Sequence, residues 1–235
     1  MVERRTDGRT LLRSALRKLW RRALGRRPAI APAIDYHGLV VFDTPELDGD
    51  GMDIEPQYLR VLREFGVTRC DRAFEFCAGP GYIGYSLLAH GVCDALTLAD
   101  VDPLAIEAAT QTRTRNGLER RVNLFRSDGL DQVPATERWD LVVGNPPHFP
   151  ERDPGDRGLL RADPGWALHR RFYADIGRFM TPGGLVVLAE ASAGSTAEDF
   201  EPMVRAGGGT LVGSVLGTDF TGARPSGYYY LASRW

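Results

Sequence analysis

Short apolar segments of strand length alternate with longer segments of helical spacing along most of the chain. The apolar segments predict strands at residues 73–76, 95–99, 122–126, 140–144 and 185–190, with two more near 210–216 and 227–234. Helices are predicted at residues 55–65, 85–90, 104–115, 166–180 and 197–206. This alternation indicates an α/β fold with a doubly wound, mainly parallel sheet, which binds ligands at the carboxyl ends of its strands.

The first 34 residues follow a different pattern. Residues 10–24 place leucines near helical spacing with Arg and Lys between them, which predicts a basic amphipathic helix. A Pro/Ala linker at residues 28–33 follows, so we expect domains at residues 1–34 and 35–235. The helix either packs on its own domain or on a second copy in a homodimer, or it anchors RNA, a phospholipid surface or an acidic partner.

Charge supports the same division. Residues 1–27 hold ten Lys/Arg and two acids, a net charge of +8, whereas the whole chain carries −2 and the remainder therefore −10. The acidic remainder argues against a broad nucleic-acid cradle on the main domain.

Two segments precede the first helix of the main domain. Residues 35–43 predict a short strand or hairpin arm. Residues 48–53 are polar and glycine-rich and are expected to form a surface turn, with a lid over the site as the alternative. Their likeness to a calcium loop is superficial, because the later glutamate and the spacing do not match.

Composition is that of a soluble globular protein, with 235 residues, 43% hydrophobic and 26% charged. No segment approaches the roughly 20 apolar residues of a membrane span, and arginines interrupt the apolar residues at the start, unlike a secretory signal. Cys70, Cys77 and Cys93 cannot all pair and match no zinc spacing. We therefore expect a reduced cytoplasmic protein without a structural metal.

The predicted strand at 73–76 runs into a glycine-rich turn and then a helix. Its acid, Glu75, is followed by Gly79, Gly81 and Gly84 at the spacing Gly-x-Gly-x-x-Gly. Such a turn lets the backbone approach a ligand at a helix N-terminus. Asp100, 21 residues after Gly79, ends the next strand where an acid would hold a ribose diol, although it could instead cap the next helix. These features fit a nicotinamide oxidoreductase as well as a methyltransferase.

The strand at 140–144 ends in Asn145-Pro146-Pro147-His148-Phe149, which the nicotinamide alternative does not explain. The prolines stiffen the chain, so the Asn145 amide oxygen and the Pro146 carbonyl can grip the N–H bonds of one planar nitrogen. Such a grip favours a pyramidal nitrogen with its lone pair facing a methyl donor. His148 or Phe149 would stack on the flat substrate. The alternative is a structural turn.

With these motifs, residues 55–235 resemble the class I S-adenosylmethionine-dependent methyltransferases, in the group with an Asn-Pro-Pro-aromatic motif. The resemblance implies a seven-stranded sheet of Rossmann-like type whose last strand is antiparallel. It implies S-adenosyl-L-methionine as cofactor, with Glu75 and Gly79 to Gly81 around its methionine part, Asp100 on the ribose and Asp128 near the adenine amine. Two departures stand out: Cys77 replaces the first loop glycine, and His148 the aromatic residue after the prolines.

The expected cofactor-binding residues are Glu75, Cys77, Ala78, Gly79, Gly81, Asp100, Val101, Asp128, Gly129 and Asn145, and the expected catalytic residues are Asn145, Pro146, His148 and Phe149. Asp128-Gly129 is equally typical of a plain turn.

Other polar residues are weaker candidates for a functional role. Glu190 ends the fifth strand and faces either the pocket or the surface. His169, Arg170 and Arg171 are expected to be solvated or salt-bridged on their helix. His37 and His90 have no identifiable partner.

The function expected from the sequence is N-methylation of a planar amide, amino or guanidino nitrogen on a small molecule or peptide. One alternative is an RNA adenine or protein glutamine N-methyltransferase recruited through the basic N-terminal helix. Another is a non-catalytic cofactor-binding partner subunit, against which the intact Asn-Pro-Pro argues.

Overall fold

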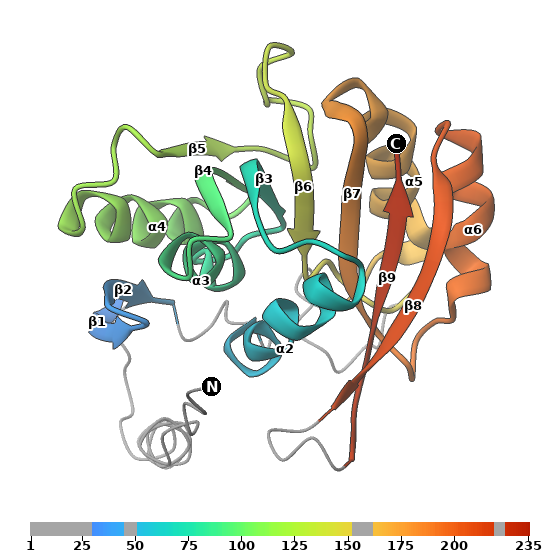
Figure 1. The fold of residues 1–235 in the computed structure, drawn as a ribbon, viewed down its shortest axis with the longest axis horizontal. Coiled ribbons are helices and arrows are strands. Elements are labelled where there is room, and N and C mark those ends of the chain that lie inside the picture. Colours follow the sequence, from blue (N-terminus) through green and yellow to red (C-terminus); the bar gives the residue numbers. More distant parts are fainter. Residues whose placement is uncertain (1–29, 45–50, 152–161, 219–223) are drawn as a thin grey trace.

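The computed structural model describes residues 30–44, 51–151, 162–218 and 224–235. Its main sheet has seven strands in the order β5-β4-β3-β6-β7-β9-β8 (Figure 1). The strands are β3 (Cys70–Phe76), β4 (Cys93–Asp100), β5 (Val122–Arg126), β6 (Trp139–Gly144), β7 (Met180–Ala191), β8 (Thr210–Thr218) and β9 (Pro225–Arg234). The last strand, β9, is antiparallel to both of its neighbours. The predicted doubly wound sheet with an antiparallel last strand is therefore confirmed.

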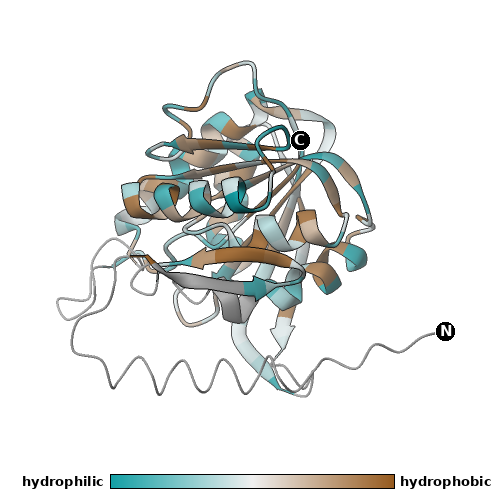
Figure 2. Cartoon of the chain, turned by 90° about the vertical axis from the view of Figure 1, so that its left-hand side faces the viewer, coloured by the Kyte–Doolittle hydropathy of each residue, from teal (hydrophilic) through white to brown (hydrophobic). Residues whose placement is uncertain are grey.

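Helices cover both faces of this sheet. The helices are α2 (Gly51–Glu64), α3 (Tyr82–Ala89), α4 (Pro103–Arg115), α5 (Ala167–Asp175) and α6 (Ala197–Ala206), with 3-10 turns η2 (Pro164–Trp166) and η3 (Ile176–Arg178) flanking α5. One core lies under α2, α3 and α4 and a second lies under α5 and α6. In Figure 2 the central strands are mostly hydrophobic, whereas the helices mix hydrophobic and hydrophilic residues, as expected for helices that bury one face. The helix α3 is an exception, because its residues 82–88 are all buried.

Successive strand residues point to opposite cores, which decides where each site residue lies. Ala73 belongs to the core under α3, whereas Phe74 and Phe76 belong to the core under α5 and α6. By the same alternation Glu75 faces α3, and Glu190, two residues after Leu188, faces α5.

A separate hairpin, β1 (Ala31–Tyr36) and β2 (Leu39–Asp43), lies beside α3 and α4 (Figure 1). Its turn, His37-Gly38, has φ of +53° and +86°, the left-handed geometry of a tight two-residue hairpin. The hairpin was predicted, but it begins at Ala31, so residues 31–33 belong to a strand and not to a linker. Residues 51–53 belong to α2 and not to a loop.

The helix predicted at 166–180 is wrong at both ends. Gly165 and Trp166 have φ of +63° and +60°, which separates η2 from α5. Met180 already starts β7, where it pairs with Trp139. The basic helix at 10–24 and residues 45–50 lie outside the described residues, and the domain boundary at residue 34 stays a prediction. No helix in the described ranges is long and apolar enough to span a bilayer.

Candidate functional site

The glycine loop, residues 77–81, joins β3 to α3 at the carboxyl edge of the sheet. Cys77, Gly79 and Gly81 all have positive φ, at +52°, +53° and +88°. The Ala78 amide donates to the Ala99 carbonyl at the end of β4 (3.0 Å). The loop is therefore a fixed turn, and the left-handed backbone at Cys77 explains why glycine is usual at that position.

Glu75 fastens the start of α3 from below. Its Oε2 accepts the Gly84 amide at 2.7 Å, and the side chain is buried. Burial raises the pKa of Glu75 to about 8, partly offset by the amides of Gly84 and Ile83. This hydrogen bond ties the start of α3 to β3, whereas contact between Glu75 and a cofactor stays a prediction.

Two glycines of the motif are required by contacts inside the protein. A Cβ on Gly81 would lie 2.7 Å from Leu98 Cδ1 and 3.0 Å from the Tyr85 ring. On Gly84 it would lie 2.7 Å from Leu96 and 2.8 Å from the Glu75 carboxylate. At these two positions close packing of α3 on the sheet demands glycine, not only the approach of a ligand that the sequence suggested.

Asp100, at the end of β4, bridges two backbone segments. Its Oδ2 accepts the Gly79 amide at 2.7 Å and its Oδ1 accepts the Asp102 amide at 2.9 Å. Capping of α4 belongs to Asp102, which accepts the Leu104 amide at 2.8 Å, so the alternative role for Asp100 is wrong. Burial raises the pKa of Asp100, against the effect of these amides.

The surroundings of Asp100 fit a nucleoside. A carboxylate oxygen can accept two hydrogen bonds, so each Asp100 oxygen retains capacity for a ribose hydroxyl. Next to it, Val101 exposes 52% of its surface, an apolar platform of the kind on which a flat base packs. The Ser127 amide donates to the Asp100 carbonyl (2.9 Å), which brings the loop after β5 to the same place.

Asp128 and Gly129 follow Ser127 on that loop. The Arg171 guanidinium of α5 donates a hydrogen bond to the exposed Asp128 carboxylate, and the two groups form an ion pair. The hydrogen bond raises the pKa of Arg171. Gly129 has φ of +62°, as in a turn. The salt bridge expected for Arg171 and the turn are both present, whereas contact between Asp128 and an adenine stays a prediction.

The acceptor loop, residues 145–149, follows β6 at the same edge. Here β6 and β3 pack so closely that a Cβ on Gly144 would lie 2.5 Å from the Phe76 carbonyl. The Gly144 carbonyl accepts the Tyr58 hydroxyl of α2 at 2.6 Å. Pro146 is buried and Asn145 is partly buried. Since β3 lies between β4 and β6, the glycine loop lies between Asp100 and the acceptor loop.

His148 is not an exposed stacking surface. It retains only 5% exposure, its ring lies edge-on to Tyr228 at 5.3 Å, and its Nδ1 lies 3.5 Å from Glu190 Oε2. Phe149 is only partly buried, and its carbonyl accepts the Asp163 amide at 2.7 Å. Of the two rings predicted to stack on a substrate, Phe149 is the less buried, and its stacking role stays a prediction.

Behind His148 lies a chain of buried ionisable groups, hereafter the buried histidine chain: Asp163, His169, Glu190 and His148. His169 Nδ1 lies 2.7 Å from Asp163 Oδ2 and its Nε2 lies 3.0 Å from Glu190 Oε1. Burial opposes a charge on His169, but the two carboxylates outweigh it and raise its pKa to about 9. The same contacts hold the pKa of Glu190 below its usual value despite its burial. Glu190 is thus not a surface acid, and His169 is salt-bridged but not solvated.

Asp163 is the site residue that the sequence did not reveal. It also accepts the amides of Leu168 and His169 (2.8 and 3.1 Å), which lie in the first turn of α5. An Asp shortly before a helix is a recognisable start signal. Its pairing with His169, and the pairing of His169 with Glu190, join segments that no local pattern connects.

A second polar cluster joins the hairpin turn to α2 and α3. The His37 and His90 rings are 4.5 Å apart, and His37 Nε2 lies 3.4 Å from the buried Glu55 carboxylate. His90 Nδ1 is 2.8 Å from the Ser86 carbonyl. Both histidines therefore have partners that the sequence did not indicate.

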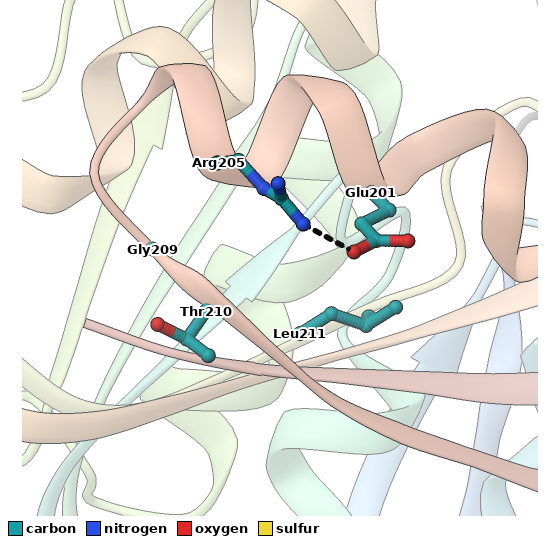
Figure 3. A pocket seen from close by; sticks show the side chains of 5 residues that line it. All are labelled: Glu201, Arg205, Gly209, Thr210 and Leu211. Atoms are coloured by element: carbon teal, nitrogen blue, oxygen red, sulfur yellow. Dashed lines mark hydrogen bonds and ion pairs between the residues drawn. The ribbon is translucent and has the colours of Figure 1, made fainter.

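A pocket lies between α6 and the start of β8 (Figure 3). It is lined by Glu201, Arg205, Gly209, Thr210 and Leu211. Thr210 pairs with Arg234, which pairs with Leu185 near the start of β7, so this pocket lies at the amino edge. It is not part of the site. In the described ranges, no group of three or more His, Cys, Asp or Glu side chains could hold a metal ion.

Comparison with known proteins agrees with this geometry. Residues 53–156 match the methyltransferase small domain family. A release factor glutamine methyltransferase of Agrobacterium fabrum is 28% identical over 202 residues, 79% of this chain and 63% of that protein. A ribosomal RNA small subunit methyltransferase C of an Enterobacter species is 35% identical over 98 residues, 42% of this chain and 27% of that protein. The chain thus spans less than two thirds of the length of either relative.

Solved structures show the same architecture. A Pyrococcus furiosus methyltransferase superposes with a TM-score of 0.60 at 16% identity, covering 97% of this chain and 98% of that one. The Thermus thermophilus 16S rRNA N2 G1207 methyltransferase, in complex with AdoMet and guanosine, gives a TM-score of 0.57 at 16% identity, covering 88% of this chain and 50% of that one. The chain therefore has the S-adenosylmethionine-dependent methyltransferase fold, and the family that it matches, over residues 53–156, is the methyltransferase small domain family.

Proposed function

We propose that this protein is an S-adenosylmethionine-dependent methyltransferase that acts on a planar, conjugated nitrogen. One observation carries the proposal: three adjacent strands end in the glycine loop, Asp100 and the Asn-Pro-Pro segment, at one edge of the sheet. The first two suit the cofactor and the third suits the methyl acceptor. A nicotinamide enzyme would use the first two but has no use for the third.

The cofactor would be held by groups whose geometry is described above. Asp100 offers remaining lone pairs to the ribose diol, Val101 offers an apolar surface to the base, and the turn at Gly79 brings the loop backbone close to both. When bound, S-adenosylmethionine supplies a methyl group on a positively charged sulfur. The chain's acidic main domain suits a cationic ligand.

The acceptor loop would then orient the nitrogen. Pro146 is buried and conformationally fixed, and Asn145 precedes it on the same stiff segment. Acceptor oxygens of Asn145 and Pro146 would take the N–H bonds of the substrate, and Phe149 would pack on its flat face. Because these bonds strengthen as the nitrogen becomes pyramidal, they lower the barrier more than they improve binding.

The relatives support two candidate methyl acceptors, and in each of them the methylated atom would be a planar nitrogen. The match to a release factor glutamine methyltransferase extends over 79% of the chain and favours a glutamine side-chain amide of a protein. The shorter match to a ribosomal RNA methyltransferase, with the fold of the 16S rRNA N2 G1207 methyltransferase, makes an exocyclic amine of RNA the second candidate. A small-molecule amide or amine remains the third, and the basic segment 1–27 is proposed to recruit a macromolecular acceptor or to form a homodimer.

The test uses labelled S-adenosylmethionine with three acceptors: a glutamine peptide from a release factor, small-subunit rRNA and free guanosine. We expect label in one of them, and a turnover about 100-fold lower for Asn145→Ala, the usual scale for one lost preorganised polar group. Affinity for S-adenosylhomocysteine should change far less. Full turnover of Asn145→Ala on the true acceptor would contradict the amine-gripping mechanism.

The chain lacking residues 1–28 tests the role of the basic segment. It should bind S-adenosylhomocysteine as the full chain does but lose acceptor affinity or a dimer contact, as measured by light scattering. Loss of cofactor binding by this shortened but folded chain would instead mean that the segment completes the pocket.

A further inference from the structure

His148 and Glu190 each turn one buried polar atom toward the other. His148 Nδ1 and Glu190 Oε2 lie 3.5 Å apart, and within the described part of the chain neither atom has a hydrogen bond of normal length. Buried polar atoms in native structures nearly always find a partner. The pair is thus placed to form a hydrogen bond that tightens when the charge on either group changes.

The protonation of the neighbouring histidine follows from geometry alone. Both ring nitrogens of His169 face carboxylate oxygens, at 2.7 Å from Asp163 and 3.0 Å from Glu190. A carboxylate only accepts hydrogen bonds, so both nitrogens must carry a proton and His169 is a cation. Two carboxylates and one imidazolium leave one negative charge uncompensated in a buried place, and a proton on His148 would compensate it.

The same rule favours one tautomer of His148. Its Nδ1 lies 3.5 Å from a Glu190 carboxylate oxygen, and a hydrogen on Nδ1 avoids placing two lone pairs opposite each other when the ring is neutral. That leaves Nε2, across the ring from the carboxylate, as the basic atom. His148 lies three residues after Asn145 and two after Pro146, on the loop proposed to hold the acceptor nitrogen.

We propose that His148 is the proton acceptor of the methyl transfer, and that Glu190, His169 and Asp163 are positioning residues that hold its ring. This rests on the proposed function. The lone pair of the acceptor nitrogen forms the new N–C bond as the S–C bond breaks, with that electron pair passing to sulfur. The N–H proton of the methylated nitrogen then passes to His148 Nε2, which makes the buried histidine chain electrically neutral.

The competing account is that the buried histidine chain only holds the acceptor loop against α5 and β7. Both accounts need the same packing, including the edge-on contact of His148 with Tyr228. They differ in whether the ring's protonation matters. In the described residues, the titratable groups that surround the His148 ring are Glu190 from β7 and Tyr228 from β9, with His169 and Asp163 behind them.

The first experiment needs no substrate. The chain has four histidines, so ¹⁵N spectra of the histidine-labelled full chain, assigned with single variants, report each tautomer. We expect the neutral His148 ring to carry its hydrogen on Nδ1 and not on Nε2. In Glu190→Gln, the protonated His169 Nε2 should donate to the new amide oxygen. The amide NH₂ should then face His148 Nδ1, which would move the hydrogen of the His148 ring to Nε2. A neutral His148 ring with its hydrogen on Nε2 and a bare Nδ1 would overturn the proposal.

The second experiment separates proton transfer from packing. His148→Phe keeps an aromatic ring that cannot take a proton, and His148→Gln fills the space with a polar group. On the acceptor that is methylated, both variants should lose about 100-fold in kcat, the scale of general-base catalysis, with KM within a few-fold. His90→Phe, which alters a histidine of the other cluster, is the matched control and should keep wild-type kcat. Near-normal kcat in His148→Phe would leave only the packing role.

Binding of S-adenosylhomocysteine to the wild type and to His148→Phe tells the two failures apart. If the wild type does not bind it, the proposed function is wrong. If both bind it equally while the tautomer or kcat result is negative, only the role of His148 is wrong.

Discussion

The glycine loop and the acceptor loop lie side by side at one edge of the sheet, but they are stabilised in different ways. Around the glycine loop, carboxylates bind backbone amides: Glu75 takes that of Gly84, and Asp100 takes that of Gly79. Behind the acceptor loop, side chains from separate elements bind one another, as in the His169–Glu190 pair between α5 and β7. The first arrangement depends on turn geometry, and the second depends on charge.

This difference predicts different failures. A substitution near the glycine loop should act through backbone conformation and local packing, whereas a substitution in the buried histidine chain should leave an uncompensated charge. Four changes test the contrast, in order of expected effect.

The largest effect is expected for His169→Ala. It leaves the Asp163 and Glu190 carboxylates buried without their cation, and breaking a buried ion pair in this way costs about 3–5 kcal/mol. Urea denaturation measures the loss. The control is Asp175→Ala, which removes an exposed partner of Arg178 and should cost less than about 1 kcal/mol. A loss of stability below about 1 kcal/mol in His169→Ala would mean that the buried histidine chain does not stabilise the fold through its charges.

The two regions should also respond to pH in different windows. The folded pKa of His169 is about 9, above its ordinary 6.5, so its stabilisation is complete below pH 6.5 and is lost as the pH rises through 9. Burial raises the pKa of Glu75 from 4.5 to about 8, so stability also falls as the pH rises from 4.5 to 8.

The free energy of unfolding should therefore drop by about 2 kcal/mol or more between pH 5 and pH 9, because a tenfold difference in proton affinity between the folded and unfolded states corresponds to about 1.36 kcal/mol. His169→Ala should flatten the upper part of this decline and Glu75→Gln the lower part. A single variant that flattens both would mean that one group controls the whole profile.

Gly81→Ala tests the packing of the glycine loop. The added Cβ meets Leu98 Cδ1 at 2.7 Å in a backbone of φ +88°, and such overpacking costs about 1–3 kcal/mol. Gly91→Ala has a similar φ of +68° but nothing within 4 Å, so the difference between the two variants isolates the packing cost. Thermal unfolding measures both. Equal losses would show that only the left-handed backbone matters at Gly81.

The smallest expected effect is a gain in stability. Cys77 holds φ of +52°, a conformation that costs a non-glycine residue about 1 kcal/mol. Cys77→Gly should remove that strain and stabilise the fold by about 0.5 kcal/mol, since glycine also makes the unfolded chain more flexible. Cys70→Gly in β3 is the opposite control, because it lacks the positive φ and should destabilise. A loss of stability in Cys77→Gly would show that the thiol's packing outweighs the strain.

Local patterns sufficed for several elements and for the residues around the glycine loop. The strand at residues 122–126 and the helix at 197–206 were predicted with the bounds that the structure gives them, because apolar period and turn residues act over a few positions. Asp100 was likewise singled out by its spacing from Gly79. The backbone amides that it binds are dictated by the loop, so sequence distance was informative.

The surroundings of the acceptor loop were harder to predict from the sequence, because the contacts there join residues that are far apart along the chain. His148 was expected to be a stacking surface and Glu190 was left between pocket and surface, since nothing near either residue specifies the other. His169 was placed on a helix correctly, but which face of that helix is buried depends on β7. The break before α5 was missed as well, because Trp166 adopts a left-handed conformation that its residue type does not favour.

Calorimetric titration of the full chain with S-adenosylhomocysteine, and with NAD in parallel, tests the central claim most directly. We predict binding of S-adenosylhomocysteine, none of NAD, and an affinity weaker by about 1.5–3 kcal/mol in Asp100→Ala, the scale of a lost hydrogen bond to a charged group. Asp102→Ala, which removes only the cap of α4, should bind as the wild type does. A folded wild type that binds NAD and not S-adenosylhomocysteine, or an Asp100→Ala variant with unchanged affinity, would contradict the assignment of this edge of the sheet as a methyl-donor site.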